Sequence, residues 1–188
     1  MRPIFFILGK PGSGKGTVCE KISDHFQLKH LSAGDLLRAE QKRDQSPHKD
    51  LILNYIASGK IVPADITVTL LKNAMNEDSI SKGFLIDGFP REMPQFKCFA
   101  EQLPVTNVQL IELLCNDDKC YERIKGRGQG RIDDNDATCK IRIDNYNSET
   151  TKVVQLFEQE SKLIRIDGNG NKDLVLKQTV ELLTPFLK

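Results

Sequence analysis

The chain has 188 residues, a length that fits one compact domain. Its 27 Lys and Arg side chains nearly balance 26 Asp and Glu, and 39% of the residues are hydrophobic, which is ordinary for a soluble globular protein. This composition argues against a basic nucleic-acid-binding surface and an acidic tail, and no stretch approaches the about 20 apolar residues of a membrane span. We therefore expect neither nucleic acid nor membrane as a partner.

The opening segment predicts a buried strand over residues 4–8. The run Ile4-Phe5-Phe6-Ile7-Leu8 is apolar throughout and stops at Gly9, as expected for the central strand of a parallel sheet that is covered on both faces. The run is too short for a secretory signal. The five cysteines are odd in number and lack the spacing of a zinc knuckle or redox dithiol. We expect reduced thiols and a cytoplasmic protein, with a nuclear pool as a further option.

Helical and strand-like segments follow in alternation. Val18, Ile22 and Phe26 recur at a spacing of four, so residues 15–26 are predicted to form a helix that packs on the sheet. Three helices are then expected in a row, at 35–45, 48–58 and 65–76. Later strands are predicted at 84–86, 108–114 and 163–166, and later helices at 92–103, 117–126, 135–160 and 172–187. This order predicts an α/β fold with a parallel sheet.

Two segments exceed what the connections of such a sheet require. The three-helix stretch of residues 32–76 is longer than a crossover, which favours a small inserted subdomain. A second, short insertion is the sequence Gly-Arg-Gly-Gln-Gly-Arg at 126–131. Because no long linker or repeat divides the chain, we expect residues 1–188 to form a single domain.

The turn between the first strand and the first helix carries a phosphate-binding motif. Residues 9–17 match the pattern G-x-x-x-x-G-K, with glycine at the usual hydroxyl position and Thr17 directly after it. Glycine N–H groups can surround a triphosphate, the helix points its positive end at the same place, and Lys15 adds a charge. Thr17, or else Ser13, is expected to face magnesium. The motif predicts binding of a nucleoside triphosphate, and its flanking strand and helix argue against a merely connecting turn.

The motif alone does not distinguish a switch, a motor and a kinase. The guanine-reading pattern N-K-x-D is missed at residues 171–173, where the aspartate stands one place early. Residues 167–170 satisfy D-x-x-G but lie beside that near-miss instead of tens of residues before it. Neither match supports a GTPase, and no length remains for the coupling domain of a motor.

Five segments together resemble the nucleoside monophosphate kinase family, which contains adenylate kinases and UMP-CMP kinases. They are residues 9–17, 30–38, 59–63, 83–91 and 130–135. The resemblance implies a P-loop fold with a central parallel sheet flanked by helices, a helical insertion at 32–76 that binds the monophosphate, and a short lid at 126–136. It also implies transfer of the γ-phosphoryl group of ATP to a nucleoside monophosphate, with Mg²⁺ bound to ATP, in a monomer.

The resemblance assigns roles residue by residue. It places the ATP phosphates on Gly12, Ser13, Gly14, Lys15, Gly16 and Thr17. It places Arg123 on the adenine face, Arg127 on the phosphates, Gly170 near the base, and magnesium on Thr17 and, through water, on Asp87. The monophosphate would contact Ala33, Arg38, Lys60, Ile61, Val62, Gly88, Phe89, Pro90, Arg91, Gln95, Arg131 and Arg142. The catalytic cations would be Lys15, Arg91, Arg127, Arg131 and Arg142.

The chemistry of phosphoryl transfer agrees with this set of residues. A phosphate oxygen with a second pKa of about 6 is mostly ionised near neutral pH, so the acceptor needs no general base. The reaction gains chiefly from alignment and from cations around the transferred group. Arg123 and Arg127 are four residues apart, so on a helix they share one face. The alternative to a role in ATP binding is that this face is simply a solvated basic surface. Asp133, Asp134 or Asn135 is expected either to cap the helix that runs toward residue 147 or to act in lid closure.

The sequence markers for the acceptor base disagree. Ala33 and residues 61–67 and 115–117 resemble UMP-CMP kinases, whereas Gln95 is the adenylate kinase residue at a position where UMP-CMP kinases have asparagine. A side-chain amide can pair with either kind of base edge. We expect UMP and CMP as acceptors, with AMP as the alternative. A P-loop kinase of another small metabolite and a non-catalytic nucleotide-binding protein are rival interpretations, and Lys10 departs from the second glycine of many relatives.

Overall fold

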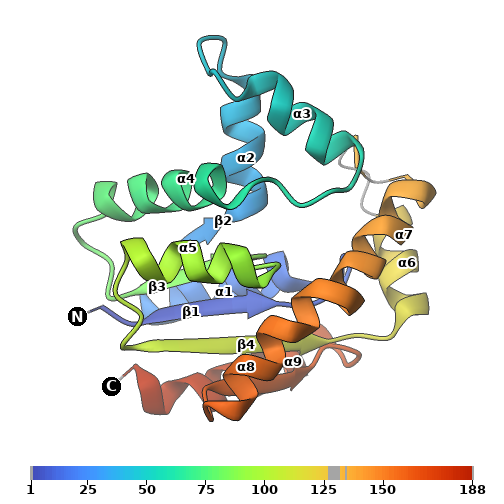
Figure 1. The fold of residues 1–188 in the computed structure, drawn as a ribbon. Coiled ribbons are helices and arrows are strands. Elements are labelled where there is room, and N and C mark those ends of the chain that lie inside the picture. Colours follow the sequence, from blue (N-terminus) through green and yellow to red (C-terminus); the bar gives the residue numbers. More distant parts are fainter. Residues whose placement is uncertain (1, 127–131, 134, 188) are drawn as a thin grey trace.

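The computed structural model describes the whole chain except residues 1, 127–131, 134 and 188. Its centre is a five-stranded sheet in the order β2-β3-β1-β4-β5, and every pairing is parallel (Figure 1). The strands are β1 (Ile4–Leu8), β2 (Lys29–Ser32), β3 (Phe84–Asp87), β4 (Val108–Leu114) and β5 (Leu163–Asp167). The predicted parallel α/β fold is therefore confirmed, with β1 at the centre of the sheet.

The side chains of β1 alternate between two separate cores, which explains its fully apolar sequence. Phe5 and Ile7 pack with α1 (Lys15–Phe26) and α9 (Lys172–Leu183) on one face. Phe6 faces the other side, where α4 (Ala64–Glu77), α5 (Met93–Gln102) and α8 (Thr151–Gln159) cover the sheet. Its ring lies edge-on to four others, at Phe89, Phe96, Phe99 and Phe157.

Three helices follow β2 without an intervening strand, as predicted. They are α2 (Ala33–Lys42), α3 (Lys49–Ala57) and α4, and α2 and α3 project away from the sheet (Figure 1). A small core of their own holds them together, formed by Leu37, Ile52, Val62 and Ile66. Strand β2 itself was not predicted, because it is a four-residue edge strand whose only fully buried residue is Leu31.

The helix predicted over residues 135–160 is divided in the structure. It consists of α7 (Asp136–Asn145), a π-helical turn (Tyr146–Thr150) and α8, and it follows α6 (Asp117–Lys125) in the chain. Asn135 is the residue that caps α7, because its side-chain oxygen accepts the N–H of Thr138 at 2.9 Å. A short 3₁₀ turn (Thr184–Phe186) follows α9.

A buried polar network anchors this divided helix to the sheet. The hydroxyl of Tyr146 donates to Glu112 of β4 at 2.8 Å, and Nε of Arg165 on β5 donates to the same carboxylate at 3.0 Å. Burial and the neighbouring carboxylate of Glu112 raise the pKa of Tyr146, so its hydroxyl stays protonated and keeps donating. The π turn is thereby fixed against the end of the sheet.

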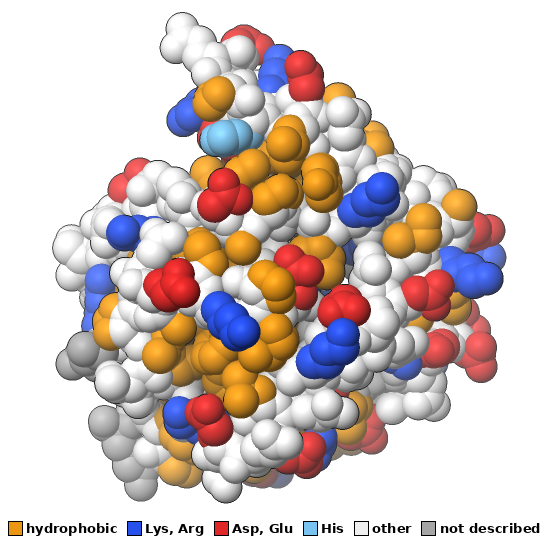
Figure 2. Space-filling view, in the orientation of Figure 1, with side chains coloured by type: hydrophobic (Ala, Val, Ile, Leu, Met, Phe, Trp, Pro, Cys, Tyr) orange, Lys and Arg blue, Asp and Glu red, His pale blue; other side chains and the backbone are white. Residues whose placement is uncertain are grey.

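The surface carries charges of both signs. On the face shown in Figure 2, Lys and Arg side chains are interspersed with Asp and Glu around apolar areas, in keeping with a net charge of +1. Within the described residues, no helix combines the length and the apolar character needed to cross a bilayer.

Candidate active site

A cleft of about 340 Å³ opens at the carboxyl ends of β1, β2 and β3, between the start of α1 and helices α2 to α4. Parallel strands end at the same edge of a sheet, so loops that are distant in the sequence meet there. Most of the predicted site residues line this cleft. They are Gly12, Gly14, Lys15, Gly16, Thr17, Ala33, Arg38, Lys60, Ile61, Val62, Asp87, Gly88, Arg91, Gln95 and Arg142.

The loop after β1 has the conformation that its glycines predict. Gly12 and Gly14 have φ angles of 82° and 99°, in the left-handed region that favours glycine. A Cβ atom on Gly12 would lie 2.3 Å from the carbonyl oxygen of Cys120, so α6 packs directly on this loop. The loop is therefore held in one shape by the helix beside it.

Lys15 lies inside the loop that it follows. Its ammonium group donates to the carbonyl oxygens of Gly9 at 2.7 Å and Lys10 at 3.1 Å. Burial lowers the pKa of Lys15 to about 8, the charges of Arg91 and Arg142 lower it as well, and Asp87 opposes them. A cation that is so weakly hydrated gains strongly from an incoming phosphate.

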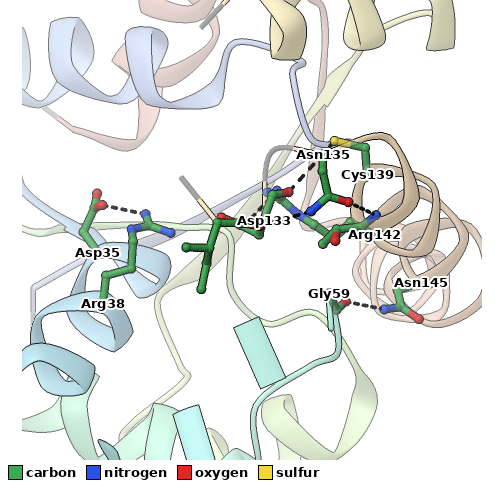
Figure 3. A network of polar contacts seen from close by, with 10 residues as sticks. Asp35, Arg38, Gly59, Asp133, Asn135, Cys139, Arg142 and Asn145 are labelled. Carbon is green, nitrogen blue, oxygen red and sulfur yellow. Dashed lines mark hydrogen bonds and ion pairs between the residues drawn. The ribbon is translucent and has the colours of Figure 1, made fainter. Parts of the chain in front are cut away.

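Three arginines line the same cleft as Lys15 (Figure 3 labels two of them, Arg38 and Arg142). Arg38 pairs with Asp35 at 2.6 Å, and Arg142 pairs with Asp133 at 2.8 Å. The third, Arg91, donates from Nε to the carbonyl oxygen of Gly88 at 2.9 Å. Burial lowers its pKa to about 10, and Arg142 acts in the same direction. The three arginines thus concentrate positive charge that a second phosphate would neutralise.

Asp133 is one of the residues before α7 that were expected either to cap this helix or to act in lid closure. It does not cap that helix but holds Arg142, while Asn135 provides the cap and Asp134 lies outside the described residues. Asn145, further along α7, donates to the carbonyl oxygen of Gly59 at 3.0 Å (Figure 3). The helix after the predicted lid is therefore bonded to the three-helix insertion.

The main chain of Arg91 is held from both sides. Its N–H is accepted by Oε1 of Gln95 at 2.9 Å, and its carbonyl oxygen accepts the hydroxyl of Thr150 at 2.7 Å. The amide nitrogen of Gln95 donates in turn to the carbonyl oxygen of Val62 at 3.1 Å. Gln95 was expected to contact the acceptor base. It lines the cleft, but its amide oxygen and its amide nitrogen are both hydrogen-bonded to main-chain groups. Thr150 had no signal in the sequence, because a π turn cannot be read from periodicity.

We expect Thr150→Val to lower kcat about tenfold, because it leaves the buried carbonyl of Arg91 without a donor and loosens the arginine, at a cost of about 1–3 kcal/mol. Thr150→Ser should restore most of the activity, since it keeps the hydroxyl. The matched control is Thr151→Val, whose hydroxyl bonds Asn147 within the helix at 2.7 Å. Steady-state kinetics of the three variants tests this, and equal kcat in both valine variants contradicts it.

Some predicted residues lie outside the cleft. Phe89 and Pro90 are buried, with the Phe89 ring packed against Phe6 and Phe99 in the core, and Ser13 is buried within the loop. Their side chains support the cleft from behind. Arg127 and Arg131 lie outside the described residues, as does most of the predicted lid.

Arg123 and Gly170 lie at the far side of the phosphate loop. Arg123 donates to the carbonyl oxygens of Ser13 at 3.0 Å and Gly168 at 3.1 Å. Main-chain and side-chain bonds of Asn169 attach the same loop to the start of α6. Arg123 therefore joins the phosphate loop to the loop that carries Gly170. Both residues were predicted to lie near the base of ATP.

The cleft has oxygen donors suited to magnesium. The hydroxyl-bearing Thr17 and the carboxylate-bearing Asp87 both line it, and Mg²⁺ prefers such hard oxygen ligands, in part through water. The residues present therefore fit the ion that the resemblance implies. A glycine loop after a central parallel strand, with lysine and magnesium-type donors in one cleft, defines the class: a P-loop nucleotide-binding protein.

Comparison with known proteins identifies the family. The family model described as adenylate kinase matches residues 7–162, and the chain belongs to this family. It is 42% identical over 177 residues to UMP-CMP kinase 2 of Caenorhabditis elegans, covering 93% of each chain. It is 40% identical over 192 residues to uridylate kinase of Schizosaccharomyces pombe, across the full length of both. With human UMP-CMP kinase it shares 38% identity over 193 residues, or 97% of each chain. The family resemblance read from five motifs is confirmed.

Proposed function

We propose that the protein transfers the γ-phosphoryl group of ATP to a nucleoside monophosphate, with UMP and CMP as the preferred acceptors. The observation that carries this proposal is the set of four cations that line one cleft. Lys15, Arg38, Arg91 and Arg142 all line it, and the charges of Arg91 and Arg142 act on Lys15. The phosphates of two nucleotides that exchange a phosphoryl group would neutralise such a concentration of positive charge.

The segments that line the cleft indicate where each of the two nucleotides would bind. The phosphate loop at residues 12–17, with Arg123, would hold ATP, and Thr17 and Asp87 would hold magnesium, which neutralises phosphate charge when bound. The insertion at residues 32–76, together with Gly88, Arg91 and Gln95, would hold the monophosphate. Residues 126–136 would close over both as a lid. Because one chain supplies all these residues, we propose a monomer.

The reaction needs cations rather than a base. The acceptor phosphate oxygen is ionised near neutral pH, so it attacks without losing a proton to the protein. Lys15, Arg91 and Arg142 would surround the oxygens of the transferred group. Their charges are already partly stripped of water, as the lowered pKa values of Lys15 and Arg91 indicate, so stabilising the charge of the transition state needs little rearrangement.

The preference for pyrimidines is supported by the relatives and by Ala33. The three proteins compared above are named UMP-CMP kinase or uridylate kinase, and each aligns with nearly the whole chain. AMP remains the second candidate because of Gln95, whose longer amide is the adenylate kinase feature.

Turnover measurements with several acceptors test the proposal directly. ADP formation from ATP and Mg²⁺ is followed with UMP, CMP, dCMP or AMP as the acceptor. We expect kcat/KM for UMP and CMP to exceed that for AMP by at least tenfold. Far faster ADP formation with AMP would overturn the pyrimidine preference, and no activity with any monophosphate would favour a kinase of another small metabolite.

A further inference from the structure

Cys19, His30 and Asp87 meet below the phosphate loop, although they come from three different elements. Cys19 lies on α1, His30 on β2 and Asp87 at the end of β3. The thiol sulfur, an imidazole nitrogen and a carboxylate oxygen lie within 4.8 Å of one another. This cluster contains nitrogen, sulfur and oxygen donors, the three ligand types of protein zinc sites.

Nε2 of His30 makes no hydrogen bond among the described residues although it is buried from solvent. The nearest acid is Asp87, with 3.7 Å between Nε2 and Oδ2, which is too long for a hydrogen bond. A buried nitrogen without a partner costs free energy, and a neutral imidazole offers a lone pair there. A metal ion would satisfy that nitrogen and draw the three donors together.

We propose that Cys19, His30 and Asp87 form a binding site for Zn²⁺ or a similar thiophilic divalent ion. Zn–ligand bonds of about 2.0–2.3 Å set ligand atoms roughly 3.3–3.8 Å apart, so side-chain movements of about 1 Å complete the site. His30 and Asp87 line the cleft, which provides the entry path for an ion.

The charges around the site allow such an ion. Lys15 and Arg91 interact with Asp87 and disfavour a free cation beside it. A Zn²⁺ ion bound by one thiolate and one carboxylate has no net charge, so these cations do not repel the complex. The thiol of Cys19 gives its proton to solvent when the Zn–S bond forms.

Occupancy would interfere with catalysis. Asp87 is also the proposed partner of magnesium, so an ion held by Asp87 and Cys19 competes with Mg·ATP. This consequence rests on the proposed function, whereas metal binding itself does not.

The test uses Co²⁺ as a coloured substitute for Zn²⁺, because thiolate ligation gives a charge-transfer absorption band. We expect the wild-type protein to bind one Co²⁺ with this band and to lose the band when Zn²⁺ is added. Cys19→Ser should remove the band, and His30→Gln should weaken Co²⁺ binding at least tenfold. Cys98→Ser is the matched control, since Cys98 is a free thiol on α5 away from the cluster. This variant should leave both the absorption band and the affinity for Co²⁺ unchanged.

The outcomes separate the site from the kinase. Absence of the band in the wild type, or its persistence in Cys19→Ser, overturns the proposal, as does equal loss in Cys98→Ser. Circular dichroism of the metal-free variants shows whether each is folded, and two different ligands are replaced so that one unstable variant does not decide the result. A wild type that shows the band but phosphorylates no monophosphate refutes the proposed function and leaves the metal site standing.

Discussion

Arg91→Ala is expected to lower kcat by about 10²–10³-fold while the protein remains folded. Arg91 lies in the cleft beside Arg142, with its Nε fixed on Gly88 and its main chain held by Gln95 and Thr150. Such a pre-aligned guanidinium stabilises charge without reorganising, so its loss weakens the transition state more than it weakens binding of the substrate. Steady-state kinetics with ATP and UMP gives kcat and KM separately.

Two further variants control this experiment. Arg91→Lys keeps a positive charge but loses the planar fork, so we expect activity between that of the wild type and that of the alanine variant. Arg43→Ala removes an arginine of the insertion at residues 32–76 that is 64% exposed and pairs with Glu40 outside the cleft. It should leave kcat within a factor of two. A folded Arg91→Ala variant with more than a third of the wild-type kcat would show that Arg91 has no catalytic role.

Gly12→Ala is expected to destabilise the protein by about 3 kcal/mol. The left-handed backbone at Gly12 costs an alanine about 1–2 kcal/mol, and its Cβ would overlap the carbonyl oxygen of Cys120 at 2.3 Å. For a chain of this length, the midpoint of thermal unfolding should fall by roughly 6–12 °C. Calorimetry or circular dichroism without nucleotide measures the shift, so that effects on ATP binding do not contribute.

Gly16→Ala in the same loop region is the matched control. Gly16 lies in the first turn of α1, and a Cβ atom there meets nothing within 4 Å. Alanine should therefore stabilise the helix by up to about 1 kcal/mol and raise the unfolding midpoint slightly. If Gly12→Ala and Gly16→Ala have the same unfolding midpoint, the left-handed backbone at Gly12 is not what holds the loop against α6.

The fold was predictable wherever periodicity or apolar runs were strong. The strand at residues 4–8 and the helix at 15–26 have the predicted bounds, because each carries an uninterrupted pattern. Strand β2 was missed because an edge strand needs few apolar residues. The π turn at 146–150 was missed because its register depends on long-range bonds, from Tyr146 to Glu112 and from Thr150 to Arg91.

The site was predictable for residues that belong to motifs. Lys15, Asp87 and Arg91 each lie in a recognisable segment, and the structure brings all three to one cleft. The partners that hold these residues have no such signal. Thr150 is an example, because its bond to the main chain of Arg91 joins the π turn to the loop after β3. Roles that fall on Arg127 and Arg131 stay predictions.

The position of β1 in the sheet has a consequence for synthesis of the chain. Its two partners are β3 and β4, so Ile4 pairs with Phe84 and Val108. At about 5–20 residues per second, a ribosome needs roughly 4–16 seconds to add the about 80 residues between Ile4 and Phe84. During that time an uncharged, proline-free and β-prone segment has no strand to pair with, which is the condition under which nascent chains associate wrongly. Among the strands of the sheet, the one that later positions the phosphate loop therefore waits longest for a partner.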